Sequence, residues 1–564
     1  MATKATLLAA LDGSGQEHIL ADYDDLTVAE QSELAAQVIS FSNAQWKHMN
    51  SMLRDSLEHL NASNRSAGTA VAAAGAPLIT PPPAATIFNL PKLLAANSAE
   101  LESIHAAGMH VIARGEGAVL LMAGGSGTRL GVTIPKGLFH CDLLASGRSL
   151  FEYHCSRVRK MEQMAAAFEK RSQQGAQPTS TACRGLLPVL VMTSDQNDAA
   201  TQAFFREHGY FGLLPDQVIF FRQTSLPCYS EKTGKVLMEA RGKMCVAPGG
   251  NGGLYESLER TPAAPSAAAA SRAHSTSELS VLAQLEARGV RYVQIFSVDN
   301  ILAKLGDPYF FGIAAKRQAE VVVKTVPKVS AEERVGVFAL KDGEWGVVEY
   351  TEIGAERAMQ RDDVSGELAY NCGNIASHCC SVEFLKLAAK DMKTSTFYHA
   401  ARKNIATVGG IASAIKMEAF IFDEFKLAKL VPTRPKDADL PDAFQIMQVD
   451  RCAEFAPIKN AEGAATDTAT TAAQLVLNLH SKWVAEAIVA SPEQLEAGEE
   501  AYAVHDRATA LQRLRDGLCK WEISPLVSYE GEGLAALAPQ LIRRSLTGEG
   551  VLSLEETTQS RANM

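Results

Sequence analysis

The sequence predicts an α/β fold built on a mostly parallel sheet that is flanked by helices. Apolar runs without strict alternation, which are typical of strands buried on both faces, occur at 118–122, 186–194, 218–223, 291–300 and 320–326. Helical patterns separate several of these runs, and alternating strand and helix units favour a parallel sheet with helices on both faces. Ligands of such sheets bind outside the carboxyl ends of the strands, so the segments that follow these runs are candidate sites.

The first part of the chain, residues 1–105, is expected to form a helical N-terminal region. Thr27 is a candidate N-cap because Glu30 follows three residues later, and apolar residues then recur at helical spacing. A stretch with five prolines, 75–91, interrupts this pattern and indicates an extended connector over a neighbouring surface.

The strands of the sheet fall within a central domain that we expect at 106–465. Helical patterns at 150–170 and 277–288 lie between the strands. Helical periodicity returns at 472–488 ahead of a charged segment, which predicts a small C-terminal region over 466–564.

Two segments inside the central domain have the composition of surface insertions. Residues 171–185 and 261–278 are rich in Ala, Ser, Pro and Gln, so they offer little apolar surface to bury. We therefore expect neither segment to belong to the core.

Composition and charge narrow the classes of function. The chain has 564 residues, of which 47% are hydrophobic and 21% charged, and these are ordinary values for a globular protein. A net charge of -10 argues against nucleic acid as the main partner, although a local basic pocket for a phosphorylated ligand remains compatible with it.

Location is predicted from features that the sequence lacks. The N-terminal apolar run is too short for a signal peptide and is interrupted by Asp12, and no stretch of 18 apolar residues predicts a membrane span. The ten cysteines include no C-x-x-C pair and no zinc-like spacing, which favours reduced thiols in a cytoplasmic protein without a membrane partner.

A glycine-rich segment follows the first predicted strand of the sheet. Gly124, Gly125 and Gly127 would let backbone N–H groups converge on an anion. Their spacing fits neither the dinucleotide-binding G-x-G-x-x-G motif nor the P-loop motif. Arg129 and Lys136 add two positive charges seven residues apart, which suits a triphosphate or pyrophosphate better than a single phosphate. A tight turn with solvated cations is the less favoured interpretation, because so many parts coincide.

The whole stretch, "LLMAGGSGTRLGVTIPKG" at 120–137, resembles the signature loop of the eukaryotic UDP-N-acetylglucosamine pyrophosphorylases, within the wider UDP-sugar pyrophosphorylase family. Further blocks resemble that family in the same order, from Gly15 to about Gly463, whereas the last hundred residues match least well. These blocks are "GQEHIL", "VMTS", "HGYFGL", "VIFFRQ", "APGGNGGLYESL", "VDNILAKLGDPYF", "VVEYTEI", "NCGNIASH", "IKMEAFIFDEF" and "EFAPIKNAEG".

This resemblance implies a mixed, mostly parallel, Rossmann-like nucleotidyltransferase sheet and a reversible uridylyl transfer with Mg²⁺. The substrates implied are UTP and N-acetylglucosamine 1-phosphate, and the products are UDP-N-acetylglucosamine and pyrophosphate. The sugar phosphate oxygen attacks the α-phosphorus of UTP in line, and no side-chain nucleophile is required because such transfer depends on positioning and charge neutralisation.

The resemblance also implies roles in UTP binding. Arg129 and Lys136 would be the catalytic residues, since they would stabilise charge on the leaving pyrophosphate. Gln223 would read the edge of uracil, and Asp299 would hold Mg²⁺, which commonly takes one or two protein carboxylates and completes its shell with phosphate and water. The UTP-binding residues implied are Gly124, Gly125, Arg129, Lys136, Gln223, Pro248, Gly250, Asp299 and Lys416.

Sugar recognition is implied for residues of several later blocks. A carboxylate such as Glu349 accepts from adjacent sugar hydroxyls, the amides of "NCGN" suit a hydroxyl or the acetamido group, and Phe420 with Phe422 would wall the acetyl pocket. Gly249 stands where the resemblance leads us to expect an acidic residue. The sugar-binding residues implied are Asn251, Gly336, Glu349, Tyr350, Asn371, Gly373, Asn374, Phe420, Phe422 and Lys459.

Alternatives remain open for single residues and for the function. A strand-end glutamine is more often a loop cap, a strand-end aspartate can cap a turn, and paired phenylalanines are more often core. A UDP-glucose or broader UDP-sugar pyrophosphorylase is the alternative enzyme, disfavoured because glucose-type enzymes usually lack the loop arginine and the "NCGN" block. A catalytically silent nucleotide sensor is a third interpretation, against which Arg129, Lys136 and Asp299 argue.

Overall fold

A computed structural model describes most of the chain. The described residues are 2–65, 77–96, 98–125, 127–172, 185–260, 279–395, 398–434, 442–491 and 504–556. The two segments interpreted as insertions, 171–185 and 261–278, lie almost entirely outside these ranges.

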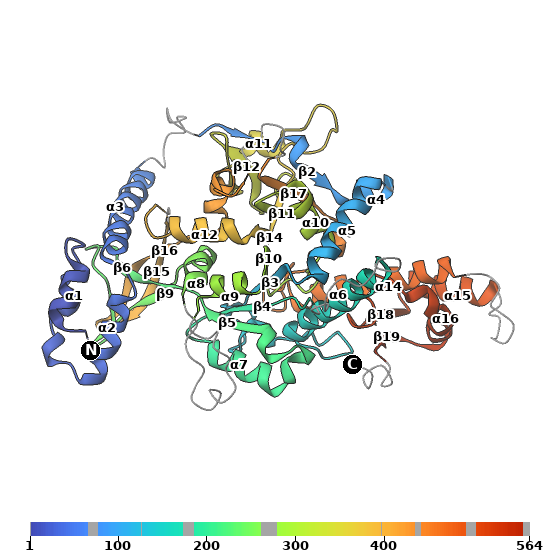
Figure 1. The fold of residues 1–564 in the computed structure, drawn as a ribbon, viewed down its shortest axis with the longest axis horizontal. Coiled ribbons are helices and arrows are strands. Elements are labelled where there is room, and N and C mark those ends of the chain that lie inside the picture. Colours follow the sequence, from blue (N-terminus) through green and yellow to red (C-terminus); the bar gives the residue numbers. More distant parts are fainter. Residues whose placement is uncertain are drawn as a thin grey trace.

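An eleven-stranded sheet forms the centre of the molecule (Figure 1). Along its main path the strand order is β2-β17-β11-β14-β10-β3-β4-β5. Neighbouring strands are parallel except at β14, which is antiparallel to both β10 and β11. The predicted mixed, mostly parallel sheet is therefore confirmed. The bounds of these strands are β2 (Ile87–Asn89), β3 (Gly117–Met122), β4 (Val189–Thr193), β5 (Val218–Arg222), β10 (Tyr292–Ser297), β11 (Val321–Val326), β14 (Gly373–Ser381) and β17 (Phe444–Gln448).

Three short strands extend the sheet beside β14. Strand β12 (Val337–Lys341) pairs with β14 and with β13 (Glu344–Val348), and its other partner is β1 (Ile79–Thr80). Strands β1 and β2 both lie in the proline-rich stretch, which therefore runs extended along the sheet as predicted. Although the boundary at residue 105 stays a prediction, this part of the expected N-terminal region contributes to the central sheet.

Helices cover both faces of the sheet because successive strand residues point to opposite sides. In β3, Leu120 belongs to one buried cluster, whereas Val119 and Leu121 belong to the other. The cluster around Leu120 includes α8 (Leu254–Glu259), α9 (Val281–Ala287) and α12 (Val382–Asp391). The cluster around Val119 includes α5 (Ala99–Ala113), α6 (Leu150–Ser172), α7 (Asp198–Glu207) and α10 (Pro308–Arg317).

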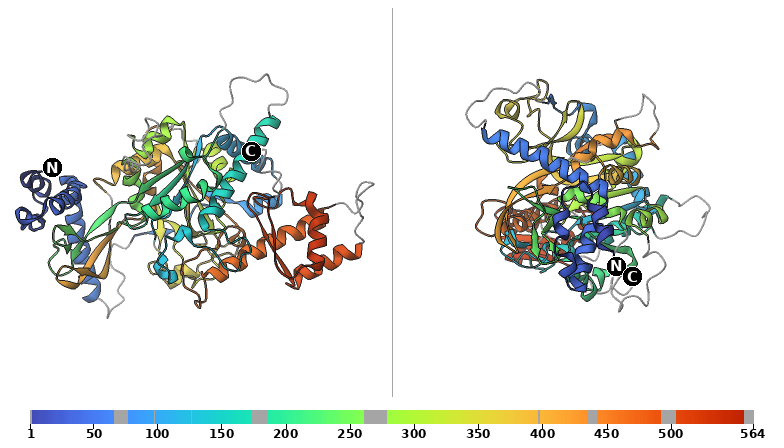
Figure 2. Two further views of the ribbon diagram at one scale, coloured as in Figure 1. Left: turned by 90° about the horizontal axis from the view of Figure 1, so that it is seen from below. Right: turned by 90° about the vertical axis from the view of Figure 1, so that its left-hand side faces the viewer.

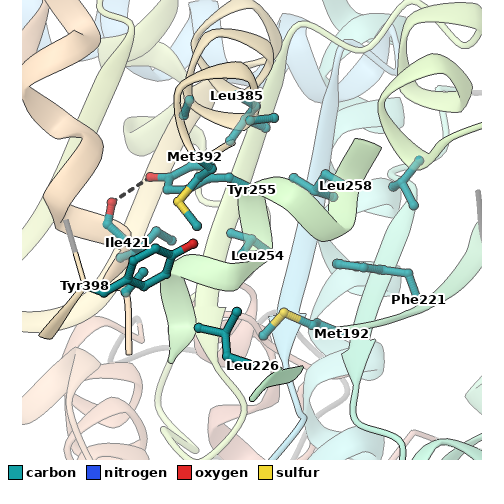
Figure 3. Packing of buried hydrophobic residues seen from close by; sticks show 14 of the residues in the cluster. Met192, Phe221, Leu226, Leu254, Tyr255, Leu258, Leu385, Met392, Tyr398 and Ile421 are labelled. Carbon is teal, nitrogen blue, oxygen red and sulfur yellow. Dashed lines mark hydrogen bonds between the residues drawn. The ribbon is translucent and has the colours of Figure 1, made fainter. Parts of the chain in front are cut away.

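Helix α8 sits between the sheet and a loop that contributes to the site (Figure 3). Leu254 packs in the same buried cluster as Met192 and Phe221 of the sheet. The hydroxyl of Tyr255 donates a hydrogen bond of 2.7 Å to the carbonyl oxygen of Ile421. Helix α8 therefore fixes the distance between the sheet and the segment around residue 421.

A four-stranded sheet, β15-β16-β6-β9, projects from the central domain and carries the N-terminal helices on it (Figure 1). The predicted capping box is confirmed, since the side chain of Thr27 accepts from the backbone of Glu30 and the Glu30 carboxylate accepts from Thr27. Gln16 joins the two parts through hydrogen bonds to Gly234 and Val236. The elements are α1 (Lys4–Leu11), α2 (Val28–Ile39), α3 (Asn43–Arg65), β6 (Ser225–Ser230), β7 (Met238–Ala240), β8 (Lys243–Met244), β9 (Val246–Pro248), β15 (His399–Thr407) and β16 (Gly410–Glu418).

The C-terminal region lies at the opposite end of the long axis from α1 (Figures 1 and 2). Its first helix, α14 (Ala469–Ala490), contributes Ala473 to the core of the central domain and Ile488 to a separate C-terminal cluster. The boundary at residue 465 stays a prediction. The other elements here are α15 (Val504–Arg515), α16 (Ala538–Thr547) and the parallel pair β18 (Cys519–Ile523) and β19 (Gly550–Leu554), and the remaining helices elsewhere are α4 (Leu90–Ala96), α11 (Ala355–Met359) and α13 (Arg451–Glu454).

Two expectations about the chain as a whole can be compared with the described residues. Within those ranges, no helix combines the length and the apolar character that crossing a bilayer requires. Nine of the ten cysteines are described; they form no disulfide with one another, and all but Cys452 are buried.

Candidate functional site

The carboxyl ends of the parallel strands meet at one edge of the central sheet. Met122 of β3 pairs with Ser297 of β10, and Val326 of β11 pairs with Gly373, where the antiparallel β14 begins. Segments that are far apart in the sequence therefore leave the sheet side by side. We call the segment that runs from Gly124 to Lys136 the phosphate loop, and it follows β3 at this edge. Gln223 follows β5 and Asp299 follows β10, whereas the "NCGN" segment leads into β14.

The phosphate loop folds back on itself above β3. The Gly127 N–H donates to the carbonyl of Ile134 at 3.1 Å, and the Lys136 N–H donates to that of Gly125 at 3.4 Å. Apart from its chain neighbours, no described residue has an atom within 4 Å of the place where a Cβ on Gly125 would stand. Gly125 is therefore accessible at the sheet edge, and its role in phosphate binding stays a prediction.

Gly124 and Gln223 lie against each other. A Cβ on Gly124 would stand 2.7 Å from Cδ of Gln223, so a side chain at residue 124 would displace the amide of Gln223. The backbone N–H of Gln223 is bonded to Thr193 at the end of β4, and no side-chain hydrogen bond of Gln223 is formed with the described residues. Its amide is therefore not engaged in loop capping there.

Lys136 and Asp299 form an ion pair, with Nζ 3.1 Å from Oδ2. Both side chains are largely buried, at 16% and 7% exposed. The second carboxylate oxygen, Oδ1, accepts a hydrogen bond from the Ser297 hydroxyl. Asp299 is thus a buried carboxylate whose cationic partner is the proposed catalytic lysine, rather than a simple turn cap.

The surroundings of Asp299 decide which metal could bind there. Among the described residues, no three His, Cys, Asp or Glu side chains gather into a metal-binding group. A single carboxylate cannot enclose a cation alone, but it suits Mg²⁺, which commonly keeps water and takes phosphate oxygens. The donor set fits a magnesium ion that arrives with a nucleotide.

Arg129 lies in a short 3-10 turn, Gly127–Leu130, and is exposed. It forms no ion pair with a charged group in the described part of the chain. Unlike Lys136, it is not held at the sheet edge by a carboxylate.

The "APGGNGG" loop packs on the backbone that follows β16. Gly250 has a φ of 82°, and a Cβ there would stand 2.2 Å from the carbonyl oxygen of Ala419. Asn251 accepts a hydrogen bond of 3.1 Å from the Ile421 N–H. At Gly249, where we expected an acidic residue, a Cβ would approach Leu226 to 2.8 Å, so the packing explains the glycine. Pro248, at the end of β9, pairs with the start of β6.

The segment after Ala419 carries the two predicted phenylalanines. The rings of Phe420 and Phe422 stack with centroids 5.2 Å apart, and His399 lies 4.7 Å from the ring of Phe420. Both phenylalanines are half-buried rather than enclosed in the core. Asp423 accepts from His399 at 3.1 Å and from the Phe420 N–H at 2.7 Å, which holds this aromatic group in place.

Lys416 is paired as well. Its Nζ lies 2.5 Å from a carboxylate oxygen of Glu418, two residues further along β16. Glu418, Asp423 and His399 had no predicted role. Glu418 stands two residues from Lys416 on the same face of β16, whereas His399 contacts Asp423 only when β15 and the segment after β16 fold together.

Gly336, Glu349 and Asn374 lie close to one another, where β12, β13 and β14 meet. A Cβ on Gly336 would stand 3.1 Å from a carboxylate oxygen of Glu349, and the Asn374 N–H donates to the Gly336 carbonyl at 2.8 Å. Burial raises the pKa of Glu349 and neighbouring Glu352 raises it further, while Lys341 and His399 lower it. Tyr350, the next residue, is 45% exposed.

The "NCGN" segment leads into β14, whose first two residues are Gly373 and Asn374. The side-chain carbonyl of Asn371 accepts from the Lys328 N–H, and that of Asn374 accepts from the Ala376 N–H, each at 2.8 Å. Ala376 has a φ of 53°, a left-handed conformation that is strained for a residue with a Cβ. The two amide nitrogens are the groups of these side chains that could donate to a sugar.

Lys459 approaches the site from another direction. The Ile458 N–H donates to the carbonyl of Asp299 at 3.0 Å, so Lys459 follows directly after a contact with the metal candidate. Lys459 is exposed, and its Nζ lies 5.6 Å from the ring centre of Phe455. The structure thus brings Lys136 together with Asp299, and Gly336 with Glu349 and Asn374, at one edge of the sheet, whereas Pro248, Gly250 and Lys416 belong to the second sheet and the loop beside it; the binding roles of all these residues stay predictions.

Known proteins resemble the chain over most of its length. A family model described as UTP–glucose-1-phosphate uridylyltransferase matches residues 79–487. A protein of Arabidopsis thaliana named UDP-N-acetylglucosamine diphosphorylase 2 is 33% identical over 94% of this chain and 91% of its own. A Saccharomyces cerevisiae protein named UDP-N-acetylglucosamine pyrophosphorylase is 30% identical over 94% of this chain and 97% of its own.

A solved structure resembles the fold. It is that of the uridine diphosphate N-acetylglucosamine pyrophosphorylase from Trypanosoma brucei in complex with an inhibitor. The two chains are 40% identical, the TM-score is 0.82, and the match covers 99% of each chain.

Proposed function

The chain belongs to the UTP–glucose-1-phosphate uridylyltransferase family, and from that premise we propose that it converts UTP and N-acetylglucosamine 1-phosphate into UDP-N-acetylglucosamine and pyrophosphate. The observation that carries this proposal is the meeting of two groups at one sheet edge. Lys136 and Asp299 suit phosphates and a cation, whereas Glu349 and Asn374 suit a hydroxylated sugar.

The proposed reaction requires no side-chain nucleophile. An oxygen of the sugar phosphate attacks the α-phosphorus of UTP, the bond to the β-phosphate oxygen breaks, and pyrophosphate leaves with the electron pair. Arg129 and Lys136 neutralise charge on the leaving pyrophosphate. The glycine-rich loop and Gln223 hold the nucleotide, so that the α-phosphorus faces the sugar phosphate.

Mg²⁺ is part of the proposal, and Asp299 is the residue that would hold it. When bound, the ion would neutralise phosphate oxygens that otherwise repel the incoming anion. Lys136 is the present partner of that carboxylate, so a cation and a phosphate together would satisfy both members of the pair.

The identity of the sugar 1-phosphate is the most specific part of the proposal. Relatives over most of the chain are named for N-acetylglucosamine, which supports an acetamido pocket bounded by Asn374, Phe420 and Phe422. The description of the family model names glucose 1-phosphate, so a UDP-glucose or UDP-sugar pyrophosphorylase remains the second candidate. We also place the protein in the cytoplasm, since its nine described cysteines form no disulfide with one another.

One assay separates these functions. The purified protein is incubated with UTP, Mg²⁺ and each of several sugar 1-phosphates, and pyrophosphate release is followed. We expect the highest kcat/KM with N-acetylglucosamine 1-phosphate. A preference for glucose 1-phosphate would select the second candidate, and no release with any sugar phosphate would indicate a nucleotide-binding protein without catalysis.

A further inference from the structure

Strand β18 of the C-terminal region places a carboxylate inside the central domain. Its residues alternate in direction, so Trp521 and Ile523 enter the C-terminal cluster while Glu522 points the other way. Glu522 is fully buried. It accepts hydrogen bonds from the Ser146 N–H at 2.9 Å and from the hydroxyls of Ser146 and Tyr153.

The donors stand directly after the phosphate loop. Ser146 lies in the segment 140–149, which is closed by a bridge between His140 and Ser149. The Leu150 N–H donates to the carbonyl of Phe139, and the Phe139 N–H donates to that of Lys136. A continuous chain of backbone hydrogen bonds therefore connects this segment to the catalytic lysine.

Tyr153 belongs to the first turns of α6, which contact the residues next to Lys136 and Asp299. A Cβ on Gly137, next to Lys136, would stand 2.1 Å from the ring of Phe151. His154 Nε2 lies 2.9 Å from the carbonyl oxygen of Val298, next to Asp299. Burial lowers the pKa of His154 to about 3, so the ring is neutral and donates to this carbonyl from Nε2. Helix α6 thus packs against the backbone beside both Lys136 and Asp299.

We propose that Glu522 is a positioning residue, which fixes the segment 140–149 and the start of α6 so that Lys136 and Asp299 stand at the distance that the reaction needs. The inference rests on the proposed function for its effect on catalysis, but not for its effect on the loop. Three donors of the central domain converge on one carboxylate, and its removal would leave the buried hydroxyl of Tyr153 and two partly buried donors of Ser146 without that acceptor.

The test uses the full chain with Glu522→Ala and, as a matched control, Trp521→Phe. Trp521 is the adjacent residue, is buried in the C-terminal cluster and donates to Ser545 at 3.0 Å, so its change weakens that region without touching Ser146 or Tyr153. Amide hydrogen exchange over 127–140 is measured well below the melting temperature, together with the kinetics for UTP.

With Glu522→Ala we expect exchange over 127–140 to rise about threefold or more. We expect kcat/KM for UTP to fall by about 10- to 100-fold, the scale of a small misplacement of reacting groups. Glu522→Gln, which can still satisfy most of these partners, should restore much of both values. Trp521→Phe should lower the melting temperature and change both values by less than about twofold.

Two results would overturn the proposal: unchanged exchange over 127–140 in Glu522→Ala, or the same increase in Trp521→Phe, which would assign Glu522 to stability alone. If Glu522→Ala does not fold, Tyr153→Phe with Ser146→Ala removes two of the three donors from the other side, and the same exchange criterion applies. Hydrogen exchange needs no turnover, so a wild-type protein that releases no pyrophosphate would contradict the proposed function and leave this test intact.

Discussion

The phosphate end and the sugar end of the site are constructed differently. Among the residues proposed for UTP, Gly124, Arg129 and Lys136 come from one continuous loop, and Gln223, Asp299 and Lys416 join them from other segments. The sugar end instead gathers Gly336, Glu349, Asn374 and Phe420 from four separate segments. A phosphate is bound by backbone and charge, which one loop can supply, whereas a sugar needs polar groups on several sides.

This difference divides the expected effects of substitutions. A change at the phosphate end should lower turnover with every sugar phosphate alike. A change at the sugar end should discriminate between sugars and spare the binding of UTP.

Asp299→Ala should have the largest effect, because it removes the only carboxylate proposed to hold Mg²⁺ and leaves Lys136 without its partner. We expect kcat to fall by about 10³-fold, which corresponds to about 4 kcal/mol of lost transition-state stabilisation. Pyrophosphate release is measured over a range of Mg²⁺ concentrations. Asp299→Asn keeps the shape of the side chain and serves as the control; wild-type turnover in both variants would remove Asp299 from the mechanism.

Arg129→Ala should lower kcat by about 10²-fold, since one donor to the developing charge on pyrophosphate is lost. The melting temperature should stay unchanged, because Arg129 is exposed on a loop. Arg129→Lys keeps the charge without the two-pronged donor and should lie between the two proteins. Unchanged turnover of Arg129→Ala at saturating UTP would exclude a catalytic contact, and a loss limited to one sugar would break the division between the two ends.

Asn374→Leu should lower kcat/KM for N-acetylglucosamine 1-phosphate by about 10- to 100-fold, because buried polar groups of the sugar would go unpaired. UTP affinity, measured by calorimetry, should stay the same.

The control for that change is Asn374→Asp, which keeps the acceptor for the Ala376 N–H but removes the amide donor. If the donor matters, both variants lose use of the sugar. A loss confined to Asn374→Leu would show that the residue acts only by supporting the left-handed backbone at Ala376, and equal losses with glucose 1-phosphate would favour the second candidate function.

The smallest effect is expected for Glu349→Gln, which should change the stability of the folded chain slightly. Burial raises the pKa of the Glu349 carboxyl. Between its ordinary pKa and the higher folded value, the folded chain therefore keeps a proton that the unfolded chain releases. The stability from this group is complete below the ordinary pKa of 4.5 and is lost as the pH rises through the higher folded value. At pH 7 the Glu349→Gln variant should therefore be slightly more stable than the wild type. At pH values below 4.5 this effect should not separate the stabilities of the two proteins.

Melting temperatures of the two proteins between pH 4 and pH 8 check this expectation. The difference should stay below about 2 °C, because the side chain is only half-buried and solvent screens it. Glu356→Gln, at an exposed position of α11, provides the control. A difference that grows toward acid pH would contradict the sign of the pKa shift.

Much of the fold could be predicted from local rules. Thr27 and Glu30 predicted their capping box, and the continuous apolar runs predicted the buried strands, because both signals depend on neighbours in the sequence. Local patterns alone did not indicate that β14 runs antiparallel in the middle of the sheet, since pairing direction is set by contacts between distant strands.

The residues of the site also fall into those that local patterns predict and those that they do not. The glycine and cation spacing indicated phosphate chemistry directly, but the sugar residues were accessible only through resemblance. Glu418, His399 and Glu522 were missed because a charge has no visible role until its partner is known. Glu418 is an exception to this explanation, because it stands two residues from Lys416 on the same strand, where alternation places both side chains on one face.

The bond between Tyr153 and Glu522 also has a consequence for biosynthesis. A ribosome makes the chain from its N-terminus, and 369 residues separate these two partners. At about 5 to 20 residues per second, β18 emerges roughly 20 to 70 s after α6. The nascent protein therefore holds its phosphate loop without that support for most of its synthesis, and a product of premature termination before residue 522 would never acquire it.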